Sequence, residues 1–258
     1  MDGYRGPAEE GSQVTLVFLP LLLLAQNPEL GRITVRGGEA TLSVDYPRPM
    51  DSAVQTLVHK YRLPISCEDP PYVYAGEMET IPKVRFSVPK RQQFEARFPK
   101  SAGAPTALEA TVAAANAWFP YAFRIEEFGA GWTVIPTKAP DAYGRVIDIT
   151  PLLDRKVSFP FATRPIHEHA RLMAEALSAQ TGYRVSCCQG VVGGIPWGMQ
   201  QAPFGANGET ARIVLRELMD LAGGKSFYLQ RCDPVGPGQP SWCFINVIGL
   251  SATREMLP

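Results

Sequence analysis

The side chains of this sequence best suited to chemistry are its cysteines, which are Cys67, Cys187, Cys188, Cys232 and Cys243. Cys232 and Cys243 flank the segment DPVGPGQPSW, so they can face each other on the two strands of a hairpin. Facing positions bring two cysteines within disulfide reach, and we therefore predict a Cys232–Cys243 disulfide. Because the number of cysteines is odd, at least one thiol stays unpaired in an oxidising compartment.

Two of the other cysteines follow similar short segments. Cys67 comes after "IS" and Cys187 after "VS", and small buried thiols explain both positions. The states of Cys67, Cys187 and Cys188 stay open here. A cysteine nucleophile would need a histidine base beside it in space, a contact that the sequence does not reveal.

The histidines, His59, His167 and His169, form no metal-binding pattern. His167 and His169 flank Glu168 in the first turn of a predicted helix, where they point to different sides and cannot hold one ion together. The sequence also has no P-loop, dinucleotide fingerprint or Gly-x-Ser-x-Gly motif. We therefore expect no metal site and no cofactor, and we assign no catalytic residue.

Charge and composition restrict the partners. Lys plus Arg and Asp plus Glu are both 25, the formal net charge is zero, and no basic block occurs. Since phosphate neutralisation dominates affinity for nucleic acid, nucleic acid is excluded as a partner. The 24 prolines and 23 glycines gather in a few stretches, which indicates long ordered loops in a globular protein.

The N-terminal region, residues 1–30, contains the uncharged run VTLVFLPLLLLA at residues 14–25. Its length is typical of a signal peptide and is too short for a membrane-spanning helix, which needs about 20 apolar residues. We expect export to the periplasm or beyond, and no stable membrane span after processing. The alternative is a cytoplasmic protein in which residues 14–25 are a buried part of the fold.

The elements that would position these residues follow one pattern twice. In the first half, ATLSVDY, the proline-led helix PMDSAVQTLVHKY and the strand LPISCED precede the helix TALEATVAAANAWF and the hairpin YAFRIEE–WTVIPT. Thr106 and Glu109 predict a capping box at the second helix. In the second half, VSFPFAT, a helix over residues 166–181, YRVSCC, a helix over residues 209–222 and the hairpin SFYLQRC–SWCFINVI repeat this order. The repetition predicts an α+β protein of two tandem units, residues 31–138 and 151–258, with helices packed on small mixed sheets.

The two segments resemble the short N-terminal domain of secretins and TonB-dependent receptors, called the STN domain. RPMDSAVQTLVHKYRLPIS with YAFRIEEFGAGWTVI carries the resemblance in the first half, and RPIHEHARLMAEALSAQTGYRVS with ARIVLRELMDLAGGKSFYLQRC in the second. In that family a proline-led helix is followed by a short strand, a further strand, a second helix and a terminal hairpin. The resemblance implies a periplasmic docking surface for partner proteins. The transport function of secretins and receptors is not carried over to this chain.

Each predicted unit contains a long insertion between its second strand and second helix, at residues 69–105 and 189–208. Loops of this length in compact units are usually functional, although they can also cover a sheet edge. Their candidate exposed binding residues are Tyr72, Tyr74, Trp197, Met199 and Phe204. A second aromatic group is expected to be mainly core with an exposed subset: Trp118, Phe119, Tyr121, Phe123, Phe128 and Trp132.

We therefore expect an exported envelope protein that acts as a docking module for a partner protein. The alternative is an enzyme or small-molecule binder that uses a cleft between the two units, where the cysteine-bearing strands and the Gly-rich loop would meet. A deep polar pocket with Cys187 or Cys188 beside a histidine would favour the enzyme, and a flat aromatic patch would favour docking. The identity of the partner and the oligomeric state are not given by the sequence.

Overall fold

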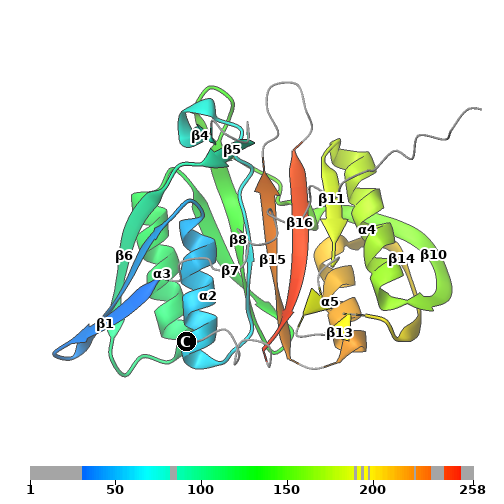
Figure 1. The fold of residues 1–258 in the computed structure, drawn as a ribbon, viewed down its shortest axis with the longest axis horizontal. Coiled ribbons are helices and arrows are strands. Elements are labelled where there is room, and N and C mark those ends of the chain that lie inside the picture. The colour runs from blue at the N-terminus through cyan, green and yellow to red at the C-terminus, as the bar shows by residue number, and fades with distance from the viewer. Residues whose placement is uncertain are drawn as a thin grey trace, which may run out of the picture.

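The computed structural model describes residues 31–81, 86–188, 191–192, 195–196, 198–223, 225–233 and 241–250. The predicted signal segment and Trp197 lie outside these described residues. The chain is an α+β protein with four α-helices in the described part. Figure 1 shows strands β7, β8, β15, β16 and β11 across the middle of the molecule, with α2 and α3 to the left and α4 and α5 to the right.

The first half runs from β1 to β9. Its elements are β1 (Arg32–Arg36), β2 (Glu39–Tyr46), α2 (Pro49–Tyr61), β3 (Ile65–Glu68), η1 (Ala75–Glu77), β4 (Met78–Ile81), β5 (Phe86–Pro89), β6 (Gln92–Pro99), α3 (Ala104–Trp118), β7 (Ala122–Phe128), β8 (Gly131–Pro140) and β9 (Val146–Asp148). Strands β1, β2 and β6 form a three-stranded outer sheet. Helices α2 and α3 pack between this outer sheet and the central strands, which gives the first half three layers.

The second half runs from η2 to β16. Its elements are η2 (Leu152–Asp154), β10 (Lys156–Pro165), α4 (Ile166–Thr181), β11 (Arg184–Cys187), β12 (Val191–Val192), β13 (Ile195–Pro196), β14 (Gln201–Thr210), α5 (Ala211–Ala222), β15 (Ser226–Asp233) and β16 (Trp242–Gly249). Here the outer layer is the antiparallel pair β10–β14. Helices α4 and α5 contact this pair, and α4 also contacts β11 of the central sheet.

The central sheet is continuous through both halves. It has seven strands, with the order β11-β16-β15-β3-β8-β7 and with β9 paired to β8. The two halves meet where β15 runs parallel to β3, with Leu229 opposite Cys67 and Gln230 opposite Glu68. The sequence predicted separate small sheets, and the structure corrects this expectation because the edge strands of the two halves pair with each other.

The two pairs of helices cover opposite faces of the central sheet. Successive side chains of a strand point to opposite faces. On β15, Phe227 and Leu229 belong to the core under α2 and α3, whereas Tyr228 and Cys232 belong to the core under α4 and α5. The described part of the protein therefore has two hydrophobic cores, one on each side of a shared sheet.

Local sequence explains how the helices begin. Pro49 occupies the first turn of α2, where the missing N–H costs nothing. Thr210 caps α5 by accepting a hydrogen bond from the backbone N–H of Ile213. The predicted capping box of Thr106 and Glu109 is wrong, because α3 already begins at Ala104 and has no side-chain cap.

The two predicted insertions are corrected in part, since each contains a strand of an outer sheet. Residues 69–105 include the short pair β4–β5 and the strand β6, which pairs with β2 over its full length. Residues 189–208 include most of β14, which pairs with β10. These segments therefore build the layer that covers the helices.

Candidate functional site

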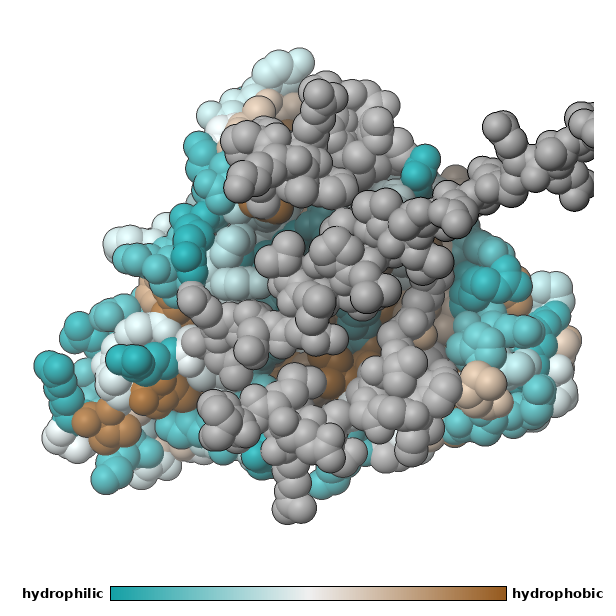
Figure 2. All heavy atoms as spheres, in the orientation of Figure 1, coloured by the Kyte–Doolittle hydropathy of each residue, from teal (hydrophilic) through white to brown (hydrophobic). Residues whose placement is uncertain are grey.

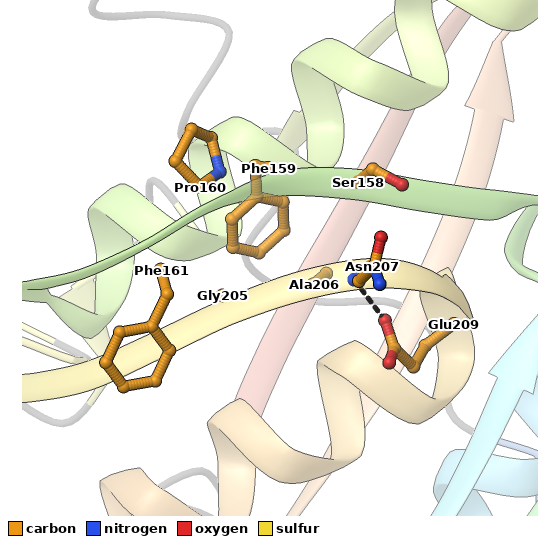
Figure 3. A pocket seen from close by; sticks show the side chains of 8 residues that line it. All are labelled: Ser158, Phe159, Pro160, Phe161, Gly205, Ala206, Asn207 and Glu209. Carbon is orange, nitrogen blue, oxygen red and sulfur yellow. Dashed lines mark hydrogen bonds between the residues drawn. The ribbon is translucent and has the colours of Figure 1, made fainter.

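The two outer layers each carry a shallow hollow on the surface. The hollow of the second half has a volume of about 560 Å³ and is formed by β10 and β14 (Figure 3). Its lining residues are Ser158, Phe159, Pro160, Phe161, Gly205, Ala206, Asn207 and Glu209. It is open to solvent and only weakly polar, which suits contact with a protein side chain more than enclosure of a small substrate.

A bulge in β10 shapes this hollow. The register of β10 with β14 shifts between Phe159 and Ala162. Phe159 therefore points inward and packs against His169, whereas the ring of Phe161 is 75% exposed. Gly205 permits the close crossing of the two strands, since a Cβ there would lie 2.6 Å from the Cα of Phe161.

The hollow of the first half lies on β2 and β6 and has a volume of about 630 Å³. Its lining residues are Ser43, Val44, Asp45, Gln93, Phe94, Glu95, Arg97 and Trp118. Trp118 is the last residue of α3 and is 69% exposed. Because β2–β6 and β10–β14 are the outer layers of the two halves, the hollows occupy comparable positions and each presents one exposed aromatic ring.

The aromatic residues near Trp118 divide into buried and exposed ones, and the sequence predicted such a division without saying which residues are exposed. Phe119, Tyr121, Phe123 and Phe128 are buried, and Trp118 is their exposed member. Phe161 was not among the predicted binding residues. In the sequence, Phe159 and Phe161 are two apart on a strand and would share one face. Only the bulge, which has no clear sequence signal beyond Pro160, turns the second ring outward.

The predicted binding residues that the structure describes do not form one surface. Tyr72 was expected to be exposed, but it is only 5% exposed and its ring meets Tyr121 edge-on at 5.9 Å. The guanidinium of Arg48 lies 5.6 Å from the centre of the Tyr72 ring, at cation–π distance. This contact explains why Tyr72 is buried and not exposed for binding. Tyr74 is half-buried and lies against Gly144.

The remaining predicted residues belong to the second half. Met199 is 58% exposed, in the segment before β14. Phe204 is half-buried and packs against Phe159 and His169. It therefore lies under the hollow that carries Phe161, and not on a separate binding loop.

At the joint between the halves, one buried ion pair links α5 to β3. Nε and Nη2 of Arg212 donate to the two carboxylate oxygens of Glu68 at 2.7 and 3.0 Å. The Tyr228 hydroxyl donates to the same carboxylate at 2.7 Å, and Asp154 also pairs with Arg212. Burial, together with the charge of Glu68, raises the pKa of Tyr228 well above its usual value, so the phenol stays a donor.

On the other face of the sheet, a second charged cluster crosses the joint. Arg48 pairs with Asp69 of the first half and Asp233 of the second, and Arg231 pairs with Asp51 of α2. Arg48 and Asp69 meet as an ion pair at 2.8 Å, without the alignment of a hydrogen bond. Burial raises the pKa of Asp69 to about 7, although the neighbouring arginine opposes this shift.

The pocket described at the joint is small. The pocket beside Asp69 has a volume of about 50 Å³, which holds one or two water molecules. None of the three pockets described above contains a histidine. Among the described residues, no group of three or more His, Cys, Asp or Glu side chains could hold a metal ion. The charged groups here are paired with each other and act as structural contacts.

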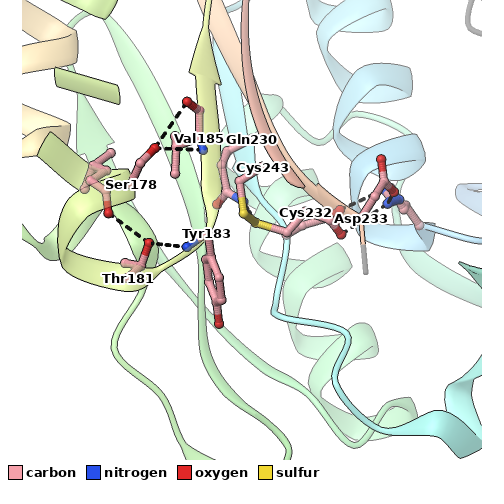
Figure 4. Close-up of a disulfide and its surroundings, with 11 residues drawn as sticks. Ser178, Thr181, Tyr183, Val185, Gln230, Cys232, Asp233 and Cys243 are labelled. Atoms are coloured by element: carbon pink, nitrogen blue, oxygen red, sulfur yellow. Dashed lines mark hydrogen bonds and ion pairs between the residues drawn. A yellow bond between two sulfur atoms is a disulfide. The ribbon is translucent and has the colours of Figure 1, made fainter. Parts of the chain in front are cut away.

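The cysteines lie in or beside the central sheet. Cys232 and Cys243 are opposite each other on β15 and β16 and are joined by a disulfide (Figure 4). The neighbours Cys187 and Cys188 at the end of β11 are also joined. Cys67 is a free thiol buried in the core of the first half, and burial raises its pKa well above the usual value. A thiol of this kind is protonated and unreactive.

Comparison with family models, curated proteins and solved structures found no match for this chain. Within the described residues, none of the helices combines the length and apolar character that crossing a membrane requires. Figure 2 shows a largely hydrophilic described surface on this face, with apolar patches near β1. The two hollows and their exposed aromatic residues are the candidate site of this chain.

Proposed function

We propose that this chain is an exported protein of the bacterial envelope that docks a partner protein through the hollows of its outer layers. In this proposal, the chain contains two tandem copies of an STN-like unit. The rings of Trp118 and Phe161 are the anchors that the partner covers. The protein has no catalytic role of its own in this scheme.

The exposed rings are the observation that carries the proposal. Aromatic side chains that are buried on binding contribute most to protein interfaces, especially where a shallow depression surrounds them. Trp118 and Phe161 are 69% and 75% exposed and each lines a hollow of more than 500 Å³. A monomeric protein gains nothing in stability from leaving such rings in water.

The order of elements supports the tandem arrangement. The series β2-α2-β3-β6-α3-β7-β8 in the first half has the same order as β10-α4-β11-β14-α5-β15-β16 in the second. In both halves the helix pair lies between an outer layer and the shared sheet. This order also agrees with the STN-like pattern, in which a further strand precedes the second helix.

The position of Cys232 and Cys243 supports export. Disulfides persist in oxidising compartments and are rare in the cytosol. Mass spectrometry of the mature protein from the native envelope fraction tests this part. We expect a new N-terminus near Ala25, and an intact Met1 would contradict export by a cleaved signal peptide.

Site-specific photo-crosslinking in the native bacterium tests the docking role. A photoreactive phenylalanine analogue is placed at position 161 or 118, and at 143 as a matched control. Tyr143 is 81% exposed and belongs to neither hollow, so it controls for exposed aromatic character alone. We expect a discrete adduct with one protein from position 161 or 118 and none from 143. Equal adducts at all three positions, or none at 118 and 161, would contradict the proposal.

A further inference from the structure

The joint between the halves shows how two edges of this sheet recognise each other. β15 is the first strand of the second hairpin, and it pairs in parallel with β3, the strand that follows the first helix. β7 is the equivalent of β15, because each is the first strand of the hairpin that ends its half. β11 is the equivalent of β3, because each follows the first helix of its half. Among the described residues, the central sheet therefore ends in one edge of each kind, β7 and β11.

Edges of these two kinds could also join two copies of the chain. If β7 of one copy paired with β11 of another as β15 pairs with β3, the contact would be head to tail. Such a contact leaves the same two edges free at the ends of the pair, so it can continue without closing. An exposed strand edge with free N–H and C=O groups favours this kind of association.

The register defines which residues correspond. Ile125 of β7 and Cys67 of β3 both face Val134, and Gln230 of β15 and Cys187 of β11 both face Ile245. Ile125 therefore corresponds to Gln230. Two residues earlier on the same strands, Phe123 corresponds to Tyr228.

At the β7 edge, a helix side chain occupies the backbone groups of Phe123. Asn116 of α3 donates from Nδ2 to the carbonyl oxygen of Phe123 at 2.9 Å and accepts from its N–H at 2.8 Å. In the joint, the N–H of Tyr228 instead bonds to the Ser66 hydroxyl of β3 at 3.1 Å. Asn116 thus holds the backbone group that a neighbouring strand would otherwise engage.

At the β11 edge, Ser178 of α4 has the same role. Its hydroxyl accepts from the N–H of Val185 at 3.0 Å and lies 3.4 Å from the carbonyl oxygen of Val185. The hydroxyl proton has a closer acceptor in the carbonyl of Ala174 at 2.8 Å, so the N–H contact is the stronger of the two with Val185.

At the joined β3 edge, the helix residue that corresponds to Ser178 is apolar. Ser178 of α4 precedes Val185 by seven positions, and Val58 of α2 precedes Ile65 of β3 by seven positions. Val58 is fully buried, and its side chain can form no hydrogen bond. A polar side chain therefore binds the backbone at the β11 edge, and an apolar side chain has the corresponding position where β3 is paired.

We propose that Asn116 and Ser178 are edge caps that prevent the chain from adding a second copy of itself head to tail. Without the caps, β7 of one copy pairs with β11 of the next. The caps also explain why the sheet does not continue into a second copy of the chain, although its two edges are complementary.

Sedimentation velocity of the full chain tests this inference with the variants Asn116→Leu and Ser178→Val, which remove the hydrogen bonds of the two caps. Each single variant opens one edge, so each alone should stay monomeric. An equal mixture should form a dimer with twice the monomer mass, and the double variant should form longer chains. The wild-type chain should stay monomeric at the same concentrations.

Controls separate edge pairing from general stickiness. Glu109→Leu on α3 and Glu175→Val on α4 add apolar groups at exposed positions of the same helices and should leave the mixture monomeric. Circular dichroism verifies that each variant is folded. If one of the two variants does not fold, the experiment is repeated with Asn116→Ala and Ser178→Ala. A folded mixture that stays monomeric, a single variant that self-associates, or a wild-type chain that forms head-to-tail chains would overturn the proposal.

Discussion

Replacement of Arg212 by methionine tests whether the buried ion pair holds the two halves together. Glu68 is fully buried and Arg212 is only 8% exposed, so neither charge is hydrated in the folded state. The substitution removes two charge-assisted hydrogen bonds and leaves the Glu68 carboxylate with the Tyr228 hydroxyl. Methionine keeps an unbranched apolar stem like that of arginine, so the change removes mainly the charged guanidinium group.

The expected cost is large relative to the stability of a domain. Removing one partner of a buried pair leaves an uncompensated charge and destabilises by about 3–5 kcal/mol. Since folded domains are stable by roughly 5–15 kcal/mol, Arg212→Met should shift the unfolding transition strongly. Combining it with Glu68→Gln removes the stranded charge. The double variant should therefore lose about 1–3 kcal/mol less than the sum of the single losses.

Guanidinium unfolding monitored by far-UV circular dichroism measures these differences. The matched control is Arg171→Met, which breaks an ion pair with Glu175 on the surface of α4, where both side chains are more than half exposed. Exposed pairs contribute roughly 0–1 kcal/mol, so this variant should resemble the wild type. A loss below about 1 kcal/mol for Arg212→Met, or additive losses in the double variant, would refute the role assigned to the pair.

Three further predictions concern a carboxyl group, a disulfide and a glycine. The pKa of Asp69 is raised to about 7, so its stabilising contribution is complete below a pH of about 4 and is lost as the pH rises to about 7. Asp69→Asn should flatten this fall in urea unfolding between pH 5 and 7. Reduction of the Cys232–Cys243 bond should cost up to about 3 kcal/mol in thermal or denaturant unfolding. Two free thiols in non-reducing peptide maps of exported protein would contradict the bond. A Cβ at Gly131 would lie 1.8 Å from a backbone carbonyl oxygen, so Gly131→Ala should destabilise by at least about 3 kcal/mol. Gly129→Asn, in an open turn, should cost little in the same unfolding assay.

Elements with a strong local period could be predicted from the sequence. The helix over residues 166–181 has the predicted bounds, and α2 begins at Pro49 as expected. Both helices place apolar residues on one stripe that faces a sheet. The alternating strands of the two hairpins were also recognisable, because each has one face in a core.

The outer layers were harder to predict, for two different reasons. Strand β6 has a clear alternation of Phe94, Ala96 and Phe98, all buried, but it lies in a segment interpreted as an insertion. Strand β14 has weak signals, since its inward residues include Ala202 and Ala206 and its composition is rich in glycine. Short side chains suffice there because β14 packs closely on the helices.

The candidate site depends on contacts that leave little trace in the sequence. Tyr72 is buried because the chain after β3 folds back under Arg48, a residue that is distant from it in sequence. Phe161 is exposed because of a bulge in β10. The partners Glu68 and Arg212 are 144 residues apart, and no periodicity relates them.

The ion pairs at the joint help to define the register between β15 and β3, which the backbone pairing alone defines poorly. Only two residue pairs join β15 to β3, which is too short a ladder to define its register well. Arg212 reaches Glu68 on one face of the sheet, and Arg231 reaches Asp51 on the other. A slip by one residue would turn Arg231 to the wrong face and separate it from Asp51, while Glu68 would lose its register with the second half. Because each pair combines an acid of the first half with an arginine of the second, the ion pairs specify one alignment and disfavour the neighbouring ones.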